Sequence, residues 1–286
     1  MNKPGYLGKK GYTVFKNDIN KETELKILKD LMVKPFIPKS IIPVSKFPVY
    51  RESTKKYYLP RFYGIENFGN PKRVEIEMGD KINIEFKGNL RDYQDNIVDK
   101  YVNYVSDIGG GLLEIDTGLG KTVIALNILT KINVKALIIV HKEFLMNQWI
   151  ERIEQFIPKA RIGKIQGSKI DIEDKDIVIG MLQSISMKDY DQEVFDSFGI
   201  TVIDEVHHMG AEVFSQALYK VVTRYMLGLS ATMDRKDGLT SVFKMFIGGI
   251  VHTEKRKQEN NNIIVRRIDY KVDDEEFNEV KHNFRG

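Results

Sequence analysis

Cysteine is absent from this 286-residue chain. Its absence excludes a disulfide scaffold, a zinc site with cysteine ligands and a cysteine nucleophile. Long hydrophobic runs are missing too, since Ala136 to Val140, the longest in the middle of the chain, has the length of a strand and not of a membrane span. The first ten residues are polar and basic, unlike a secretory signal. We therefore expect a soluble, intracellular protein with no membrane partner.

Positive charge is concentrated in the first third of the chain. Residues 1–88 hold 18 Lys and Arg against 10 Asp and Glu, whereas the remainder holds 26 against 30. In this first segment, basic residues alternate with aromatic ones at Tyr50-Arg51, at 55–58 and at 61–63. Such a pattern fits contact with nucleic acid, and it equally fits strands with lysine on their wet faces. We favour nucleic-acid contact for residues 1–88.

The same segment mixes helical and strand periodicity, which predicts a small α+β accessory domain over residues 1–88. Apolar residues recur at helical spacing from Leu25 to Met32, after a possible N-cap at Asn20. Further on, residues 74–78 and 82–86 each alternate between apolar and polar side chains, with a Gly-Asp-Lys sequence between the two runs. This pattern predicts an antiparallel hairpin with one wet face.

From residue 89 to residue 252, short apolar runs alternate with amphipathic helical patterns. This order predicts a parallel sheet with helices on both faces and ligands at the carboxyl ends of the strands. Residues 253–286 begin with a polar, linker-like sequence and are too few for a further domain. The expected strands are Leu112–Ile115, Ala136–Val140, Ile177–Met181, Ile200–Ile203 and Met226–Leu229.

A glycine-containing loop follows the first of these strands and opens a helix. Its sequence is Thr117-Gly118-Leu119-Gly120-Lys121-Thr122. Glycines let backbone amides close around phosphate oxygens, and the helix N-terminus adds partial positive charge. Lys121 would then reach the β- and γ-phosphates of ATP, and the Thr122 hydroxyl would hold Mg²⁺. The match to the full phosphate-loop pattern is partial, because Ile115 stands where that pattern has glycine.

Two adjacent carboxylates, Asp204 and Glu205, follow a buried strand of the same expected sheet. Neighbouring side chains of a strand point to opposite faces, so the turn after the strand must redirect one of them. Asp204 would then face the Mg²⁺ ion, and Glu205 would orient and deprotonate the attacking water. Both residues are therefore candidate metal and catalytic residues.

Together with Ser230-Ala231-Thr232, these segments resemble the superfamily 2 helicases and translocases, in which they would be motifs I, II and III. The resemblance implies a RecA-like P-loop fold over residues 89–252 that uses ATP and Mg²⁺. The catalytic residues would be Lys121, Asp204, Glu205 and His207, while Ser230, Ala231 and Thr232 would couple hydrolysis to movement. The narrower likeness is to the XPB and UvsW subgroup and to helicases of large DNA viruses.

That subgroup implies further contacts. The sequence Leu90-Arg91-Asp92-Tyr93-Gln94 is similar to its adenine-recognition segment, in which Gln94 would bind the adenine edge and Arg91 would pack on its face. Lys142 lies in a segment similar to motif Ia, and Gln183 and Ser184 in one similar to motif Ib. Both segments are expected to contact the nucleic-acid backbone. Lone Trp149 is interpreted as a core residue.

We expect an ATP-hydrolysing helicase or translocase acting on DNA or RNA, with DNA favoured. The resemblance implies that residues 253–286 begin a second RecA-like domain, without which a monomeric chain would hydrolyse ATP weakly and unwind nothing. A viral member would act in the viral factory or virion, a cellular one in the cytoplasm or nucleus. Two alternatives are a P-loop enzyme with a small substrate, such as a kinase, and a binding module with an idle P-loop.

Overall fold

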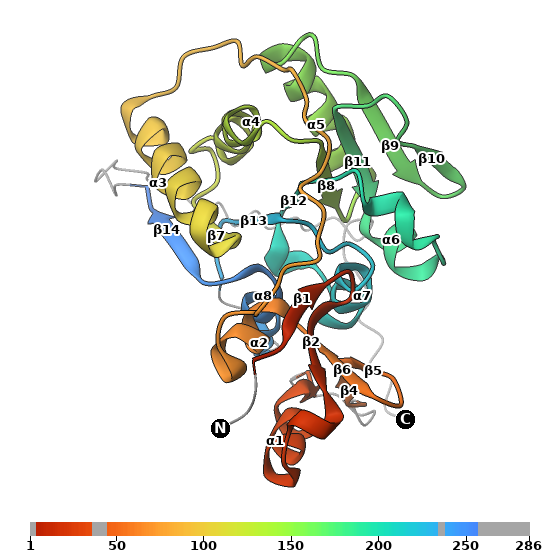
Figure 1. Cartoon of the computed structure of the whole chain (residues 1–286). Coiled ribbons are helices and arrows are strands. Elements are labelled where there is room, and N and C mark those ends of the chain that lie inside the picture. Colours follow the sequence, from red (N-terminus) through yellow and green to blue (C-terminus); the bar gives the residue numbers. More distant parts are fainter. Residues whose placement is uncertain (1–3, 36–44, 234–237, 257–286) are drawn as a thin grey trace, which may run out of the picture. The chain divides into compact units, whose positions relative to one another are not determined.

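An eight-stranded sheet crosses the larger part of the molecule in the computed structural model, which describes residues 4–35, 45–233 and 238–256 (Figure 1). Its strand order is β10-β9-β11-β8-β12-β13-β7-β14, and every pair is parallel except the β9–β10 hairpin. The strands are β7 (Gly110–Ile115), β8 (Ala136–Val140), β9 (Ile162–Gln166), β10 (Lys169–Asp171), β11 (Ile177–Met181), β12 (Ile200–Ile203), β13 (Tyr225–Ser230) and β14 (Ile250–Glu254).

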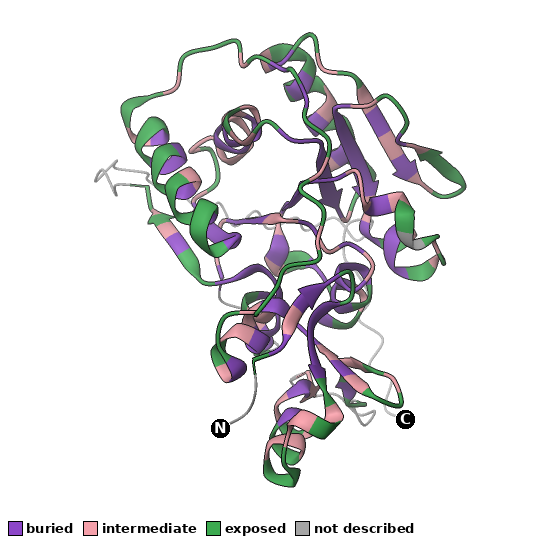
Figure 2. Ribbon diagram, viewed as in Figure 1, coloured by how far each residue is buried: buried purple, intermediate pink, exposed green. Residues whose placement is uncertain are grey.

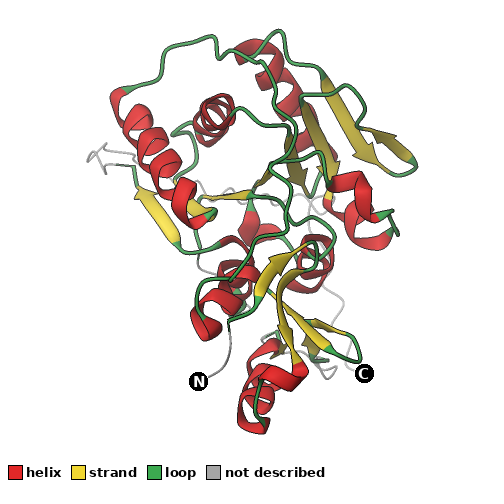
Figure 3. Cartoon of the chain, in the orientation of Figure 1, coloured by secondary structure: helices red, strands yellow, loops and turns green. Residues whose placement is uncertain are grey.

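Helices cover both faces of this sheet (Figure 3). In β8, Leu137 and Ile139 pack into one hydrophobic cluster and Ile138 into the other, because successive side chains leave a strand on opposite faces. The first cluster is completed by α6 (Leu182–Met187), α7 (Ala211–Leu218) and α8 (Thr240–Ile247), and the second by α3 (Asp92–Ile108), α4 (Lys121–Ile132) and α5 (Glu143–Phe156). Single 3-10 turns span Gln192–Phe195 and Val206–His208.

The expected α/β fold class is therefore confirmed, and each of the five predicted strands is present. Three strands were not predicted, namely β9, β10 and β14. β10 and β14 are the two edge strands, with no partner strand on one side of the backbone, and β9 is the neighbour of β10. Polar residues such as Lys164 of β9 and His252 of β14 are tolerated in these outer strands. An edge strand therefore lacks the continuous apolar run by which a central parallel strand is recognised.

The first part of the chain forms a smaller α+β assembly around its own core. Its elements are β1 (Tyr6–Gly8), β2 (Gly11–Phe15), a 3-10 turn (Lys16–Asp18), α1 (Lys21–Leu31), β3 (Met32–Val33), β4 (Phe47–Pro48), β5 (Arg51–Glu52), β6 (Lys56–Leu59) and α2 (Arg61–Phe68). The main sheet is antiparallel, in the order β1-β2-β6-β5. Its inner face packs against α1 and α2 in one buried core that includes Tyr12, Leu59, Ile27 of α1 and Phe68 of α2 (Figure 2). The predicted N-cap is confirmed, since the Asn20 side chain accepts a hydrogen bond from the Thr23 amide at 2.8 Å.

The hairpin predicted over residues 74–86 is wrong. This segment is extended but unpaired within itself, and it forms only isolated bridges, from Val74 to Leu7 and from Lys81 to Val134. Gly79, with a φ of +79°, packs directly against the backbone of Gly199 rather than closing a turn. Of the alternating apolar residues, Ile82 and Ile84 are buried against the larger sheet, whereas Val74 and Met78 are exposed. An extended strap and a strand share the same period, so the sequence pattern cannot separate them.

Arg61 connects the smaller assembly to the larger sheet. Its buried guanidinium donates hydrogen bonds to the carbonyl oxygens of Arg224 (2.9 Å), Ile108 (3.3 Å) and Gly109 (3.4 Å). Burial lowers the pKa of Arg61 to about 10. The domain boundary expected at residue 88 stays a prediction, and residues 257–286 of the expected linker lie outside the described residues. No helix in the described ranges is long and apolar enough to span a membrane.

Candidate nucleotide-binding site

The loop between β7 and α4 has the backbone geometry that phosphate binding requires. Gly118 and Gly120 have φ angles of +84° and +86°, which L-residues with a side chain adopt only with strain. Gly120 is also the N-cap of α4, so the free amides of the first helical turn follow it directly. The loop therefore turns a helix N-terminus and two flexible residues toward the carboxyl edge of the sheet.

The start of α3 holds this loop in place. The Leu119 carbonyl oxygen accepts hydrogen bonds from the Tyr93 hydroxyl at 2.9 Å and from the Gln94 amide at 3.1 Å. The side-chain oxygen Oε1 of Gln94 in turn accepts a hydrogen bond from the Arg91 backbone amide at 3.0 Å. In the side-chain amide of Gln94, the NH₂ group can donate one more hydrogen bond and the carbonyl oxygen can accept one more. The adenine contacts expected of Arg91 and Gln94 stay predictions, but the structure places both residues beside the phosphate loop.

Asp204 lies at the end of β12 and is almost fully buried, with 6% of its surface exposed. Its Oδ2 accepts a hydrogen bond from the indole nitrogen of Trp149 at 2.8 Å. Burial raises the pKa of the Asp204 carboxyl, and the bond from Trp149 acts in the opposite direction. Trp149 is buried, as interpreted from the sequence, but no sequence pattern indicated this second role. The Glu205 backbone also hydrogen-bonds the Asp204 carboxylate, so this side chain is held in one orientation.

Glu205 turns its side chain to a different direction because its backbone is left-handed, with φ and ψ both 51°. Adjacent side chains of a strand point to opposite faces, so this left-handed turn is what changes the direction of the Glu205 side chain relative to Asp204. Its Oε1 lies 3.4 Å from the Lys121 amine, and its Oε2 lies 3.4 Å from Nδ1 of His207. The Lys121 amine also donates to the Ile115 carbonyl oxygen at 3.4 Å. The two loops are thus joined by an ion pair across the carboxyl edge of the sheet.

His207 links the acidic pair to the end of β13. Its Nδ1 lies 2.6 Å from the Ser230 hydroxyl oxygen, and that hydroxyl hydrogen-bonds the Thr232 carbonyl oxygen. A hydroxyl has one proton to donate, so we assign the proton of the first bond to Nδ1 of His207. His207 therefore stands between Ser230 and Glu205, and the coupling role expected of Ser230 stays a prediction.

Glu114, at the end of β7, joins three further segments to the site. Its carboxylate accepts hydrogen bonds from the Met233 amide at 3.2 Å and from the Thr253 hydroxyl at 3.1 Å. Lys255 pairs with Glu114 at 3.2 Å and with Asp116, just before the phosphate loop, at 3.4 Å. The segment after β14 is therefore tied to the loop. Glu114 was not predicted, because a single acid in a strand carries no pattern.

The residues expected to contact nucleic acid lie apart from this cluster, at the carboxyl ends of β8 and β11. Lys142 and Gln183 are exposed, and Ser184 accepts a hydrogen bond from the Gly167 amide at 2.9 Å. Neighbouring His141 has its pKa lowered, first by burial and then by the nearby positive charges of His208 and Lys142. The structure places these side chains on the same edge of the sheet as the phosphate loop, and their backbone contacts stay predictions.

Magnesium in such a site would take oxygen ligands from few protein groups. Among the described residues, no cluster of three or more His, Asp or Glu side chains could by itself hold a metal ion. The expected donors, Thr122, Asp204 and Glu205, supply a hydroxyl and carboxylate oxygens, which are ligands that Mg²⁺ prefers while substrate phosphates complete its shell. The donor set therefore fits Mg²⁺ bound together with a nucleotide.

Residues 87–235, which contain all of these loops, match the family described as "Type III restriction enzyme, res subunit". The chain belongs to this family. Among curated relatives, it is 34% identical over 281 residues to "Putative ATP-dependent RNA helicase L396" of Acanthamoeba polyphaga mimivirus, which covers 95% of this chain and 53% of that protein. It is 32% identical over 209 residues to "Putative helicase 161L" of Invertebrate iridescent virus 6, a match that covers 72% of this chain and 46% of that protein. The chain thus spans about half the length of these relatives.

The family's fold recurs in a solved structure, that of the UvsW helicase from bacteriophage T4. The two share a TM-score of 0.55 at 19% identity, over 82% of this chain and 94% of that one. The resemblance to superfamily 2 helicases is confirmed by the family match and by the viral helicases. The narrower XPB and UvsW subgroup stays a prediction, because the likeness to UvsW shows the fold alone.

Proposed function

We infer that this chain is the nucleotide-binding part of an ATP-dependent helicase or translocase that moves on nucleic acid. The observation that carries the proposal is the meeting of two loops. The Lys121 amine, at the start of α4, lies 3.4 Å from the Glu205 carboxylate at the end of β12, and buried Asp204 stands next to it. Membership of the family and the name of the mimivirus relative support ATP as the substrate.

Each residue has a distinct part in hydrolysis under this proposal. Backbone amides at Gly118–Gly120 bind the phosphates, and Lys121 exchanges part of its contact with Glu205 for the γ-phosphate. Thr122 and Asp204 would hold Mg²⁺, which when bound neutralises the charge of the β- and γ-phosphates. Glu205 orients a water molecule and accepts its proton on a carboxylate oxygen.

Changes at the nucleotide are communicated through His207. This residue lies 3.4 Å from Glu205 and 2.6 Å from Ser230, so any shift of the carboxylate alters the contact with the end of β13. We place nucleic acid on the exposed residues at the ends of β8 and β11, among them Lys142 and Gln183. A second RecA-like domain would contribute the arginines that stabilise the transferred phosphoryl group.

The proposal is tested by ATP hydrolysis measured with increasing single- and double-stranded DNA and RNA. We expect nucleic acid to stimulate hydrolysis. Glu205→Gln should retain nucleotide binding and lose hydrolysis by about 10²-fold or more, because general-base catalysis is worth that much. Hydrolysis that ignores every nucleic acid would favour a small-substrate P-loop enzyme, and hydrolysis unaffected by Glu205→Gln would contradict the assignment of the base.

A further inference from the structure

The outer face of the β1-β2-β6-β5 sheet carries a row of polar and aromatic side chains. Tyr6 of β1 pairs with Thr13 of β2, and Thr13 pairs with Tyr58 of β6. The next pair in this register, Tyr12 and Leu59, is buried in the core on the inner face. Because successive residues alternate between faces, Tyr6, Thr13 and Tyr58 lie together on the face away from that core.

Lysines lie over these rings without a carboxylate partner. The Lys56 amine donates to the Tyr6 hydroxyl at 2.9 Å and lies 4.9 Å from the ring centroid of Phe15, which is 39% exposed. The Lys10 amine lies 5.4 Å from the ring centroid of Tyr58. Within the described ranges, no ion pair to an acid is recorded for Lys10 or Lys56. Two positive charges are thus held on aromatic rings, and Glu75 acts on Lys56 only from beyond ion-pair distance.

A hollow of about 340 Å³ lies between Tyr6 and Tyr58 on this face. Thr13 and the turn residues Lys9 and Lys10 line it as well. Glu75 is an acid at its edge, but Arg73 pairs with Glu75 at 2.5 Å and packs over the ring of Tyr6 at 4.4 Å. The hollow therefore combines two ring systems with a net positive rim.

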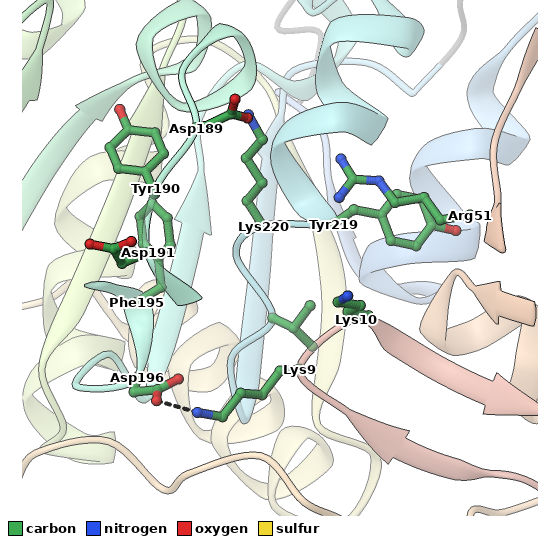
Figure 4. A pocket seen from close by; sticks show the side chains of 11 residues that line it. Lys9, Lys10, Arg51, Asp189, Tyr190, Asp191, Phe195, Asp196, Tyr219 and Lys220 are labelled. Atoms are coloured by element: carbon green, nitrogen blue, oxygen red, sulfur yellow. Dashed lines mark hydrogen bonds and ion pairs between the residues drawn. The ribbon is translucent and has the colours of Figure 1, made fainter. Parts of the chain in front are cut away.

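A second cavity, of about 210 Å³, lies on the other side of the same turn (Figure 4). Lys9 forms an ion pair there with Asp196, which fastens the turn to the larger sheet's side. Asp189 and Asp191 line this cavity together with Arg51 and Lys220, so its charges are mixed. Lys220 donates to carbonyl oxygens at the end of α6, the helix that carries the expected motif Ib. The turn is thus anchored through Lys9, and the amine of Lys10 lies over the ring of Tyr58 at the hollow.

We propose that this hollow binds a single strand of nucleic acid. Phosphates contact Lys10 and Lys56, and an unpaired base enters between Tyr6 and Tyr58. Aromatic rings beside a positively charged groove are how proteins hold single strands, whereas a duplex keeps its bases stacked and offers none to a hollow. The proposal rests on the proposed function, which makes nucleic acid the partner, and adds a contact outside the helicase motifs.

The test is fluorescence anisotropy of a labelled oligothymidylate, and of a duplex of equal length, at several salt concentrations without nucleotide. The variant Lys10→Ala/Lys56→Ala is compared with Lys21→Ala/Lys29→Ala, which removes the same charge from exposed sites on α1, across the sheet. We expect the first variant to bind the single strand about tenfold more weakly. Its slope of log affinity against log salt should shrink by about 1.4, since each single-strand phosphate contact contributes about 0.7.

Tyr58→Leu separates stacking from charge. It should weaken single-strand binding about tenfold while leaving the salt slope unchanged, because a base contact releases no counterions. The proposal would be overturned if Lys10→Ala/Lys56→Ala bound the single strand with wild-type affinity, or if the α1 control lost as much affinity. It would also be overturned if the variant lost as much affinity for the duplex, or if the wild-type protein bound no single strand. Nucleotide binding that depends on Lys121, measured separately, reports on the proposed function and not on the hollow.

Discussion

Replacing Trp149 by phenylalanine would remove one hydrogen bond from the metal-facing carboxylate. The indole nitrogen donates to Oδ2 of Asp204 at 2.8 Å, and both side chains are buried, at 1% and 6% exposure. Phenylalanine keeps the aromatic ring but has no donor. The Glu205 backbone would still hydrogen-bond Asp204, but because both side chains are buried, water cannot readily replace the bond lost from Trp149.

The size of the effect follows from the burial of that carboxylate. A hydrogen bond to a charged group contributes about 1.5–3 kcal/mol, and the loss leaves a buried oxygen unpaired. Burial already raises the pKa of Asp204, and without Trp149 the pKa should rise further. Removing the partner that orients a metal ligand weakens metal affinity by about 10–100-fold. We therefore expect Trp149→Phe to need about 10–100-fold more Mg²⁺ to bind nucleotide.

The assay is a Mg²⁺ titration of fluorescent ADP binding, together with the free energy of unfolding in urea. Tyr101→Phe is the matched control, because the buried Tyr101 hydroxyl donates to the Met226 carbonyl oxygen at 2.7 Å, away from the nucleotide loop. Both variants lose one hydrogen bond from a buried aromatic residue and should be destabilised by about 1 kcal/mol or more. The Mg²⁺ requirement should rise in Trp149→Phe alone.

A Mg²⁺ midpoint that stays the same in Trp149→Phe would refute the reasoning, provided that the variant is destabilised as expected. It would mean that Asp204 keeps its orientation through packing alone. A rise of equal size in Tyr101→Phe would show a general loosening of the sheet. Nucleotide binding in the presence of a chelator should be similar in all three proteins, because it depends on Lys121 and the loop amides.

Two further predictions concern Asp176 and Gly120, with Gly167 as the control for Gly120. Burial raises the pKa of Asp176, but three hydrogen bonds from Arg161 outweigh it and hold that pKa below 3.8. Asp176→Asn should therefore cost about 2 kcal/mol of unfolding free energy at pH 7, and this difference should disappear as pH falls through the lowered pKa. An equal difference in urea unfolding at pH 3 and pH 7 would contradict this. Gly120→Ala places a Cβ 2.4 Å from the Gln94 amide at a φ of +86°, so it should abolish nucleotide binding. Gly167 has a φ of +56° and no atom within 4 Å of an added Cβ, so Gly167→Ala should cost only about 1 kcal/mol of stability and leave nucleotide binding intact. If Gly120→Ala bound nucleotide as well as Gly167→Ala does, the steric argument would be excluded.

The candidate site was predictable where its chemistry is local in sequence. The residues from Thr117 to Thr122 share one loop, and Asp204 and Glu205 are neighbours, so their spacing can be read directly. Trp149 is different, because it reaches Asp204 from 55 positions away through the packing of α5 on the sheet. A single tryptophan in an amphipathic helix carries the same pattern whether or not it donates to an acid.

The sequence by itself determined the class of the larger sheet and the position of its phosphate loop. Apolar strands, helical periodicity and glycine placement are local properties, and each depends on a few consecutive residues. Only the tertiary structure decided that residues 74–86 form a strap and not a hairpin, and that His207 separates Ser230 from the acidic pair. It also placed Lys10 and Lys56 over tyrosines of one sheet face. Those outcomes depend on which distant surfaces meet, and a contact between distant residues leaves no period in the chain.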